Sequence, residues 1–293
     1  METFGTISEL RNRLCDEKNR GMSVAFVPTM GALHPGHGSC IEIAREIGDV
    51  VVVSIFVNPT QFGPTEDLDR YPNTLDADLE NCRSWGVDVV FVPEASEIYP
   101  AEQKFWVEIG KFSEPLCGRT RVGHFRGVAT VVLKLFNIVD PDVAVFGQKD
   151  AQQAVVIREM ARQLNLPVRI ALSPTVRETD GLAWSSRNRY LGPEERERAS
   201  SIYQALLFGK KMLVDGERRP ETITEGVRKR LDDSGIDGVE YVELVDAASL
   251  GVLDEANGKV LLAVAVKIGT TRLIDNLVLE IGVDGVVTET MLF

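Results

Sequence analysis

Short, almost wholly apolar runs alternate with longer amphipathic segments through the first part of the chain. Because successive positions in these runs are all apolar, each run predicts a strand covered on both faces, as in a parallel sheet. Strands that alternate with helices predict βαβ crossovers and a Rossmann-like, doubly wound parallel sheet of the α/β class. The predicted strands are 24–27, 50–57, 87–92, 142–146 and 168–172, and the predicted helices are 7–19, a segment from about 34 to 47, 67–85, 124–139 and 151–164.

In the first part of the chain we also predict loops at 58–64 and 93–100. The alternation of strands and helices ends after about residue 173. Residues 175–191 are polar and turn-like, and beyond them helices precede strands. This order predicts a smaller α+β domain with an antiparallel sheet, so we predict two domains, residues 1–175 and residues 176–293. In the second domain the predicted helices are 193–214 and 220–233, and the predicted strands are 239–245, 261–266 and 277–281.

Composition narrows the possible partners and the cellular location. The net charge of −12 provides no basic surplus to neutralise phosphates, which argues against nucleic-acid and anionic-membrane partners. The apolar runs are too short to span a bilayer, and residues 1–13 lack the apolar core of a signal peptide. Four dispersed cysteines without a CxxC pair indicate reduced thiols and a cytoplasmic protein.

The segment Val24–His37 carries the strongest chemical pattern. An apolar strand ends at Pro28, a glycine-containing turn follows, and His34 and His37 stand at the start of the next helix. Histidines three residues apart share one helix face, and the helix N-terminus attracts anions, so we predict a phosphate site. Two alternatives remain open: ordinary surface histidines, or a zinc pair completed by His124 or a distant acid.

Two further segments suit a phosphate-bearing ligand. Residues 147–150, Gly-Gln-Lys-Asp, follow a predicted strand, where Lys149 would balance phosphate charge and Asp150 would hold the lysine or a ribose hydroxyl. Residues 185–187, Ser-Ser-Arg, lie in a polar loop whose hydroxyls and guanidinium would close over a triphosphate. A lysine and an acid in a loop, or serines in a loop, are also common in solvated turns.

Uncharged amides and acids complete the candidates. Gln61 and Gln153 lie near strand ends and suit the hydroxyl or carboxylate of a small polar substrate, although solvated glutamines are the ordinary alternative. Asp76 and Asp78 fit the solvated face of a helix, or Mg²⁺ held through one carboxylate, waters and phosphates. No Walker A, GxGxxG or serine-hydrolase elbow occurs in the sequence, which disfavours those classes.

His-Pro-Gly-His at 34–37 resembles the HxGH motif of the class I aminoacyl-tRNA synthetase and nucleotidyltransferase superfamily. Ser185-Ser186-Arg187 resembles the superfamily's second, mobile phosphate-binding loop. Five segments look like the pantothenate synthetase family and fall in the family's order across most of the predicted N-terminal domain, with the last just beyond its predicted end. They are 28–37 (PTMGALHPGH), 56–62 (FVNPTQF), 124–132 (HFRGVATVV), 146–150 (FGQKD) and 185–191 (SSRNRYL).

The resemblance implies that the chain condenses pantoate with β-alanine, using ATP and Mg²⁺, through a pantoyl-adenylate. It implies catalytic roles at the phosphates for His34, His37, Lys149 and Arg187, and a cytoplasmic homodimer with small-molecule substrates. It assigns pantoate to Gln61 and Gln153 and β-alanine to the vicinity of Gln61. Of the two acids considered above, Asp78 is our candidate ligand for Mg²⁺. The implied ATP contacts are Met30, Gly31, Ala32, Leu33, His34, Pro35, Gly36, His37, Gly147, Gln148, Lys149, Asp150, Val176, Trp184, Ser185, Ser186 and Arg187.

In this interpretation residues 1–175 bind nucleotide and pantoate, and residues 176–293 form a lid. Three positions depart from the family pattern: Trp184 replaces a common Met, Ala151 replaces a common Tyr, and Gly38-Ser39 stands where a bulkier apolar residue is usual. None removes a group that the chemistry needs, so we expect an active enzyme. The competing interpretations are another HxGH nucleotidyltransferase, a non-catalytic nucleotide-binding regulator and a zinc hydrolase.

Overall fold

A computed structural model of the chain describes residues 1–64, 66–99 and 101–293. The chain divides into two compact units. The first comprises Met1–Ser113, Arg121–Gly147 and Val156–Ser173, and the second comprises Glu114–Thr120, Gln148–Val155 and Pro174–Phe293. Within the described ranges, no helix combines the length and the apolar character needed to cross a membrane.

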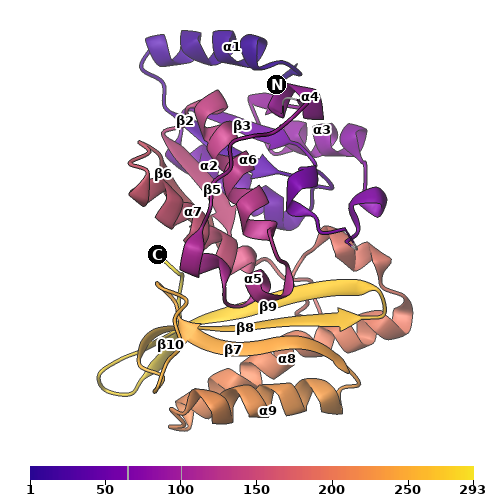
Figure 1. Cartoon of the computed structure of the whole chain (residues 1–293), viewed down its shortest axis with the longest axis vertical. Coiled ribbons are helices and arrows are strands. Elements are labelled where there is room, and N and C mark those ends of the chain that lie inside the picture. Colours follow the sequence, from indigo (N-terminus) through magenta and orange to yellow (C-terminus); the bar gives the residue numbers. More distant parts are fainter. Residues whose placement is uncertain (65, 100) are drawn as a thin grey trace. The chain divides into compact units, whose positions relative to one another are not determined.

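The first unit contains a six-stranded, wholly parallel sheet in the order β1-β4-β3-β2-β5-β6. The predicted α/β class is therefore confirmed. Figure 1 labels β2, β3, β5 and β6 of this sheet. The strand order reverses between β2 and β5, and ligands of such sheets bind beyond the carboxyl ends of the strands at this reversal. The strands are β1 (Glu2–Phe4), β2 (Val24–Thr29), β3 (Val50–Ile55), β4 (Val89–Phe91), β5 (Val143–Gly147) and β6 (Arg169–Ser173).

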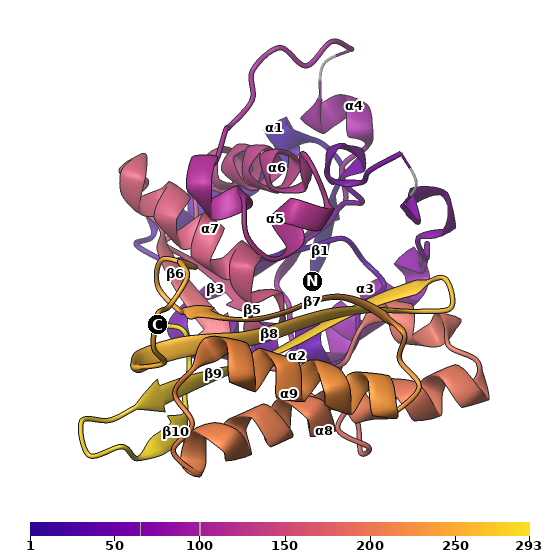
Figure 2. The same cartoon turned by 60° about the horizontal axis from the view of Figure 1, so that its bottom comes forward.

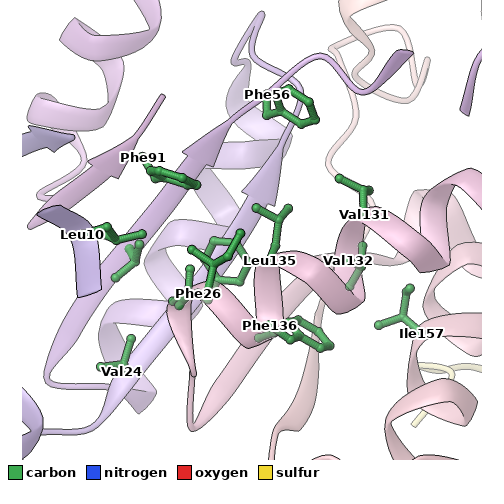
Figure 3. Packing of buried hydrophobic residues seen from close by; sticks show 14 of the residues in the cluster. Leu10, Val24, Phe26, Phe56, Phe91, Val131, Val132, Leu135, Phe136 and Ile157 are labelled. Atoms are coloured by element: carbon green, nitrogen blue, oxygen red, sulfur yellow. The ribbon is translucent and has the colours of Figure 1, made fainter. Parts of the chain in front are cut away.

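The inner strands of this sheet, β2, β3, β4 and β5, are covered on both faces, as their continuous apolar sequences predict, whereas the edge strands β1 and β6 are partly exposed. Along β2, Val24 and Phe26 join one cluster of buried side chains, whereas Ala25 and Val27 join the cluster on the opposite face. Figure 3 shows Phe26 beside Leu135 and Phe136 in the first cluster. The helices with residues in this unit are α1 (Ile7–Asn19), α2 (Pro35–Ile47), α3 (Leu75–Ser84), α4 (Ala95–Ile98), α6 (His124–Val139) and α7 (Ala151–Gln163), the last of which begins in the second unit.

The second unit is built on an antiparallel sheet in the order β10-β9-β8-β7. Helices α8 and α9 lie side by side along one face of that sheet (Figure 2). A Cβ on Gly209 of α8 would lie 2.6 Å from Leu262, so only glycine allows this close approach of helix and sheet. The elements are α5 (Cys117–Thr120), α8 (Pro193–Val214), α9 (Pro220–Asp233), β7 (Gly238–Asp246), β8 (Gly258–Ile268), β9 (Thr271–Ile281) and β10 (Val287–Glu289), and the predicted α+β organisation is confirmed.

Several predicted boundaries are wrong. The helix predicted at 67–85 is a short 3₁₀ turn, Leu68–Arg70, followed by α3 from Leu75, because Pro72 lacks an N–H and disfavours helical backbone in the residue before it. The predicted loop at 93–100 contains α4, and its last residue lies outside the described ranges. The three-residue strands β1 and β10 were not predicted.

The unusual Gly38 makes room for an indole ring. A Cβ on Gly38 would lie 3.1 Å from Cε2 of Trp85, so Trp85 occupies the space that a bulkier residue 38 would need. We expect Gly38→Leu to lower the free energy of unfolding by about 1–3 kcal/mol, because the added atoms overpack this contact. Urea unfolding measures the effect, and Gly38→Leu combined with Trp85→Ala should lose less than the sum of the single variants. Strict additivity would contradict the contact.

Candidate active site

The turn after β2 is fixed by hydrogen bonds to its neighbours. Thr29 Oγ1 donates to the Ser54 carbonyl (2.7 Å) and accepts from the Gly31 N–H (3.2 Å). Gly31 and Ala32 both have left-handed backbone, with φ of 78° and 50°. A glycine tolerates this conformation without strain, whereas Ala32 must be held in it.

Asp78 supplies that restraint. Its carboxylate accepts from the Ala32 N–H (2.9 Å), the Leu33 N–H (2.7 Å) and the Thr74 hydroxyl (3.2 Å). The residue is only 2% exposed, so the alternative of a solvated helix face is wrong for Asp78, although Asp76 is exposed. The carboxylate therefore shapes the turn that leads to the histidines.

His34 and His37 cap the N-terminus of α2. His34 Nδ1 accepts from the Gly36 N–H, and His37 Nδ1 accepts from the His34 N–H, both at 3.2 Å. Since each Nδ1 is an acceptor, the proton of each neutral ring resides on Nε2. The ring centroids are 4.1 Å apart. Two Nε2–H donors thus accompany the positive end of a helix dipole, the combination that binds oxyanions.

A zinc site would require a third ligand beside His34 and His37. Among the described residues, no group of three or more His, Cys, Asp or Glu side chains is arranged to hold a metal ion. His124, the third zinc ligand considered from the sequence, has its Nδ1 2.8 Å from the Gln61 carbonyl oxygen and its Nε2 2.9 Å from Arg121 Nη1. Both of its nitrogens therefore have hydrogen-bond partners in the protein.

Gln61 lies in the 3₁₀ turn after β3 (Pro59–Gln61) and is 8% exposed. Its Oε1 accepts from Asn58 Nδ2 at 3.0 Å, and its Nε2 lies 3.0 Å from Met30 Sδ. Asn58 in turn accepts from the Tyr99 hydroxyl at 2.8 Å. Gln61 is therefore a buried, oriented amide, and the alternative of a solvated glutamine is wrong.

Charged side chains support this turn from outside. Arg121 donates to both Glu66 oxygens, through Nε and Nη2, each at 2.6 Å. Although burial opposes its ionisation, hydrogen bonding and charge attraction from Arg121 lower the pKa of Glu66 to about 2. Glu66 is consequently ionised throughout the neutral range and holds Arg121 in place.

In the second unit, Asn276 of β9 holds the turn that carries Lys149. Its Nδ2 donates to the carbonyls of Gln148 (3.1 Å) and Lys149 (2.9 Å). Burial of the ammonium lowers the pKa of Lys149, and Arg187 lowers it further, while Asp150 and Asp275 oppose the shift. A buried ammonium next to an arginine is stabilised more by a bound negative group, such as a phosphate, than an exposed ammonium is.

Asp275 is the buried partner of Arg177. The guanidinium donates to both carboxylate oxygens, at 2.6 and 3.0 Å, and stacks 3.8 Å from the ring centroid of Tyr203. Burial raises the pKa of Asp275 despite this pairing. The pair anchors β9 to the hairpin that begins at Arg177, where Arg177 and Ala183 form an antiparallel bridge.

That hairpin brings Val176 and Trp184 together, because the Trp184 N–H donates to the Val176 carbonyl at 3.0 Å. The loop after the hairpin contains a 3₁₀ turn, Ser186–Tyr190. Ser185 caps the start of this turn, because its Oγ accepts from the Arg187 N–H at 3.3 Å. The second unit thus assembles the predicted residues of 148–150, 176 and 184–187. Gln153 is half-buried on α7, and Gly147 ends β5 in the first unit.

A family model described as pantoate-beta-alanine ligase matches residues 2–278 of the chain. The chain belongs to the pantoate-beta-alanine ligase family. It is 51% identical over 281 residues to the pantothenate synthetase of Moorella thermoacetica, a match that covers 96% of this chain and 99% of the relative. It is 52% identical over the same length to pantothenate synthetase 1 of Bradyrhizobium diazoefficiens, with the same coverage.

Solved structures of the pantoate-beta-alanine ligase family share the fold. The pantothenate synthetase of Thermus thermophilus matches with a TM-score of 0.90 at 42% identity, covering 94% of this chain and 99% of that one. The Francisella tularensis pantoate-beta-alanine ligase matches with a TM-score of 0.79 at 35% identity, covering 94% and 97%. The Francisella protein was crystallised as a complex with beta-gamma ATP and β-alanine.

Sequence reasoning missed the residues that hold this ligase family's candidate groups in place. In the first unit they are Asn58, Tyr99 and Arg121, and their contacts depend on side chains distant in the sequence. In the second unit they are Asp275 and Asn276. These two had a visible pattern, since they are adjacent polar residues between Leu273-Ile274 and Leu277-Val278. In the structure they are 2% and 4% exposed.

Proposed function

We propose that this chain joins pantoate to β-alanine in two steps, through a pantoyl-adenylate. Its family membership makes it a ligase that forms pantothenate. The observation that carries the proposal is the pair of Nε2–H donors of His34 and His37 at the N-terminus of α2, beyond the carboxyl end of β2 at the reversal of the sheet. Such a site binds the phosphates of a nucleotide.

In the first step a pantoate carboxylate oxygen attacks the α-phosphorus of ATP and pyrophosphate leaves. Negative charge then grows on the phosphate oxygens, where hydrogen-bond donors already in position stabilise it. We assign this role to His34 and His37 in the first unit and to Lys149 and Arg187 in the second. No protein nucleophile is required, because the substrate's own carboxylate forms the new bond.

In the second step the amine of β-alanine attacks the acyl carbon of the adenylate and releases AMP. Positioning of the amine supplies much of the rate of such a step. The buried amide of Gln61 suits pantoate, and β-alanine would enter near it, with Gln153 as a second pantoate contact. Shielding the adenylate from water is the role we assign to the loop 184–187 and to a lid formed by residues 176–293.

The remaining assignments concern nucleotide contacts. We assign ATP to Met30–His37, to Gly147–Asp150, to Val176 and to Trp184–Arg187. Two supports come from the structure: Asp78 and Thr29 fix the turn 31–33, and the hairpin pairs Val176 with Trp184. Residues 1–175 as a nucleotide and pantoate domain, the cytoplasmic location, the homodimer and the absence of nucleic-acid and membrane partners stay predictions.

Mg²⁺ at Asp78 does not fit the hydrogen bonds of this residue. Both carboxylate oxygens accept backbone N–H groups, and one also accepts the Thr74 hydroxyl. Mg²⁺ in nucleotide sites keeps several waters and is held largely by substrate phosphates. We therefore propose that Mg²⁺ enters as part of the MgATP substrate and that Asp78 shapes the nucleotide turn.

Asp78→Asn should raise the KM for ATP about tenfold or more and lower the free energy of unfolding by about 1–3 kcal/mol, because an amide N–H₂ would face a buried N–H. Steady-state kinetics at several Mg²⁺ concentrations and urea unfolding measure both effects. Asp76→Asn, on the exposed face of the same helix, serves as the matched control and should change neither. Recovery of the ATP KM at high Mg²⁺ with unchanged stability would instead make Asp78 a metal ligand.

ATP–pyrophosphate exchange with pantoate present and β-alanine omitted tests the proposed reaction. Exchange that depends on pantoate is expected, because the first step then runs reversibly without the second. Exchange with another acid instead of pantoate would favour a different HxGH nucleotidyltransferase. ATP binding without exchange would favour a non-catalytic regulator.

A further inference from the structure

We propose that His124, oriented by Arg121, is a positioning residue for pantoate recognition and that it acts in its neutral form, with the proton on Nδ1. The inference rests on the pantoate role proposed for Gln61. It concerns the chain's third histidine, which lies at the start of α6 and is 9% exposed.

The hydrogen bonds of His124 determine its protonation state. Nδ1 lies 2.8 Å from the Gln61 carbonyl oxygen, which only accepts, so Nδ1 carries a proton and donates it. Nε2 lies 2.9 Å from Arg121 Nη1, which only donates, so Nε2 is an acceptor without a proton. This tautomer is the opposite of that in His34 and His37, whose Nδ1 atoms accept.

A charged pair stabilises this arrangement. Arg121 is held by Glu66 through two hydrogen bonds of 2.6 Å, and its Nη2 also reaches the Gln61 carbonyl at 3.4 Å. The guanidinium therefore keeps the acceptor Nε2 of His124 occupied and keeps Nδ1–H directed at Gln61. Because the arginine is fixed, imidazole rotation would break two hydrogen bonds at once.

Backbone packing transmits the position of α6 to Gln61. A Cβ on Gly127, one helical turn after His124, would lie 2.3 Å from the Thr60 carbonyl oxygen and 2.8 Å from the Gln61 Cα. The Asn58 side chain bridges the same contact, since its Nδ2 donates to the Gly127 carbonyl (3.3 Å) as well as to Gln61 Oε1 (3.0 Å). The carbonyl and the side-chain amide of Gln61 are thus held from two directions.

Protonation of His124 would break this arrangement. A second proton on Nε2 would face the N–H of Arg121, so a hydrogen bond would become a contact between two donors and two positive charges. Around the ring lie the Gln61 carbonyl, Arg121 with the carboxylate of Glu66 beyond it, and the ring of Phe125 at a centroid distance of 4.9 Å. Glu66 attracts the added charge, but its oxygens are already occupied by Arg121. Acidification should therefore loosen the Gln61 turn.

The test compares two variants of different chemistry. His124→Asn places an amide N–H near the position of Nδ1, and His124→Phe removes the donor. We expect His124→Phe to raise the KM for pantoate about tenfold or more while the KM for ATP changes less than about twofold. His124→Asn should recover most of the pantoate affinity. Equal increases in both KM values, or no recovery in the Asn variant, would overturn the positioning role.

The pH dependence gives a second measurement. The ratio of kcat/KM for pantoate between the wild type and His124→Asn should fall as the pH drops from about 8 towards about 5.5, because only the wild type has an imidazole to protonate at this position. A ratio that stays constant across this range would overturn the requirement for neutral His124. Nitrogen-15 NMR of the histidines in the wild-type protein reports the tautomer without any substitution, and a proton on Nε2 of His124 would overturn the assignment.

Gln61→Ala separates the two proposals. If this variant leaves the KM for pantoate unchanged, the substrate role of Gln61 fails and the inference on His124 fails with it. If Gln61→Ala raises the KM for pantoate and His124→Phe does not, the proposed site stands and only the positioning role is overturned.

Discussion

His37→Asn should lower kcat about 10²- to 10³-fold while leaving stability within about 1 kcal/mol of the wild type. The Asn Oδ1 reproduces the acceptor Nδ1, so the hydrogen bond from the His34 N–H that caps α2 is kept. The substitution removes the Nε2–H donor. Loss of one donor to a developing oxyanion typically lowers kcat about 10²- to 10³-fold. The variant thus separates the chemical role of the histidine from its structural role.

The matched variant is His37→Gln, whose amide nitrogen reaches the position of Nε2. It should retain more activity than His37→Asn, although its cap is weaker. Pantoate-dependent pyrophosphate exchange and urea unfolding are the two measurements. If His37→Asn keeps wild-type kcat, or loses stability in proportion to its activity, His37 acts as a cap and not on the phosphates.

The α/β architecture was predictable because its evidence is local. Helices α1 and α6 begin and end at the predicted residues, since their apolar periodicity lies within one segment. The buried strands were found through their continuous apolar sequence. By contrast, β1 and β10 have only three residues each, too few for a periodic pattern, and the partner of β1 is the distant strand β4.

The site residues that lie within a sequence motif were predictable, whereas the distant residues that hold them in place were not. The sequence identified His34 and His37, but not that Asp78, more than forty residues later, would bond the turn before them. From the sequence, His124 was considered as a zinc ligand, whereas in the structure its ring is hydrogen-bonded to the Gln61 carbonyl. Such pairings depend on tertiary contacts, which a pattern within one segment does not encode.

The second unit shows the same limit and one exception. Lys149 was a candidate from its place after a strand, but its support by Asn276 comes from β9. The adjacent polar residues Asp275 and Asn276 are buried between apolar residues of β9, and most buried polar groups in proteins are hydrogen-bonded. A polar pair flanked by apolar residues therefore belongs among candidate site residues, although the predicted strand, 277–281, began just after this pair.

Lys149→Met should lower kcat/KM for ATP by about 10²-fold without loss of stability. The substitution keeps the length of the side chain and removes a buried ammonium, whose pKa is lowered by burial and by Arg187. Since burying that charge is unfavourable, folding should tolerate its removal. Use of ATP should weaken, because the substitution removes the positive charge that balances the phosphates.

The pH profile tests the same lysine in the wild type. A lowered pKa means that the free enzyme loses the ammonium proton at a pH below 10.5, the ordinary value, so kcat/KM for ATP should fall on the alkaline side. Bound phosphates favour the charged form and raise this pKa, so the corresponding fall in kcat should occur at higher pH. Lys149→Met should lack the alkaline fall in kcat/KM. If the variant keeps that fall, another group is responsible, and if it binds and uses ATP like the wild type, Lys149 has no role at the phosphates.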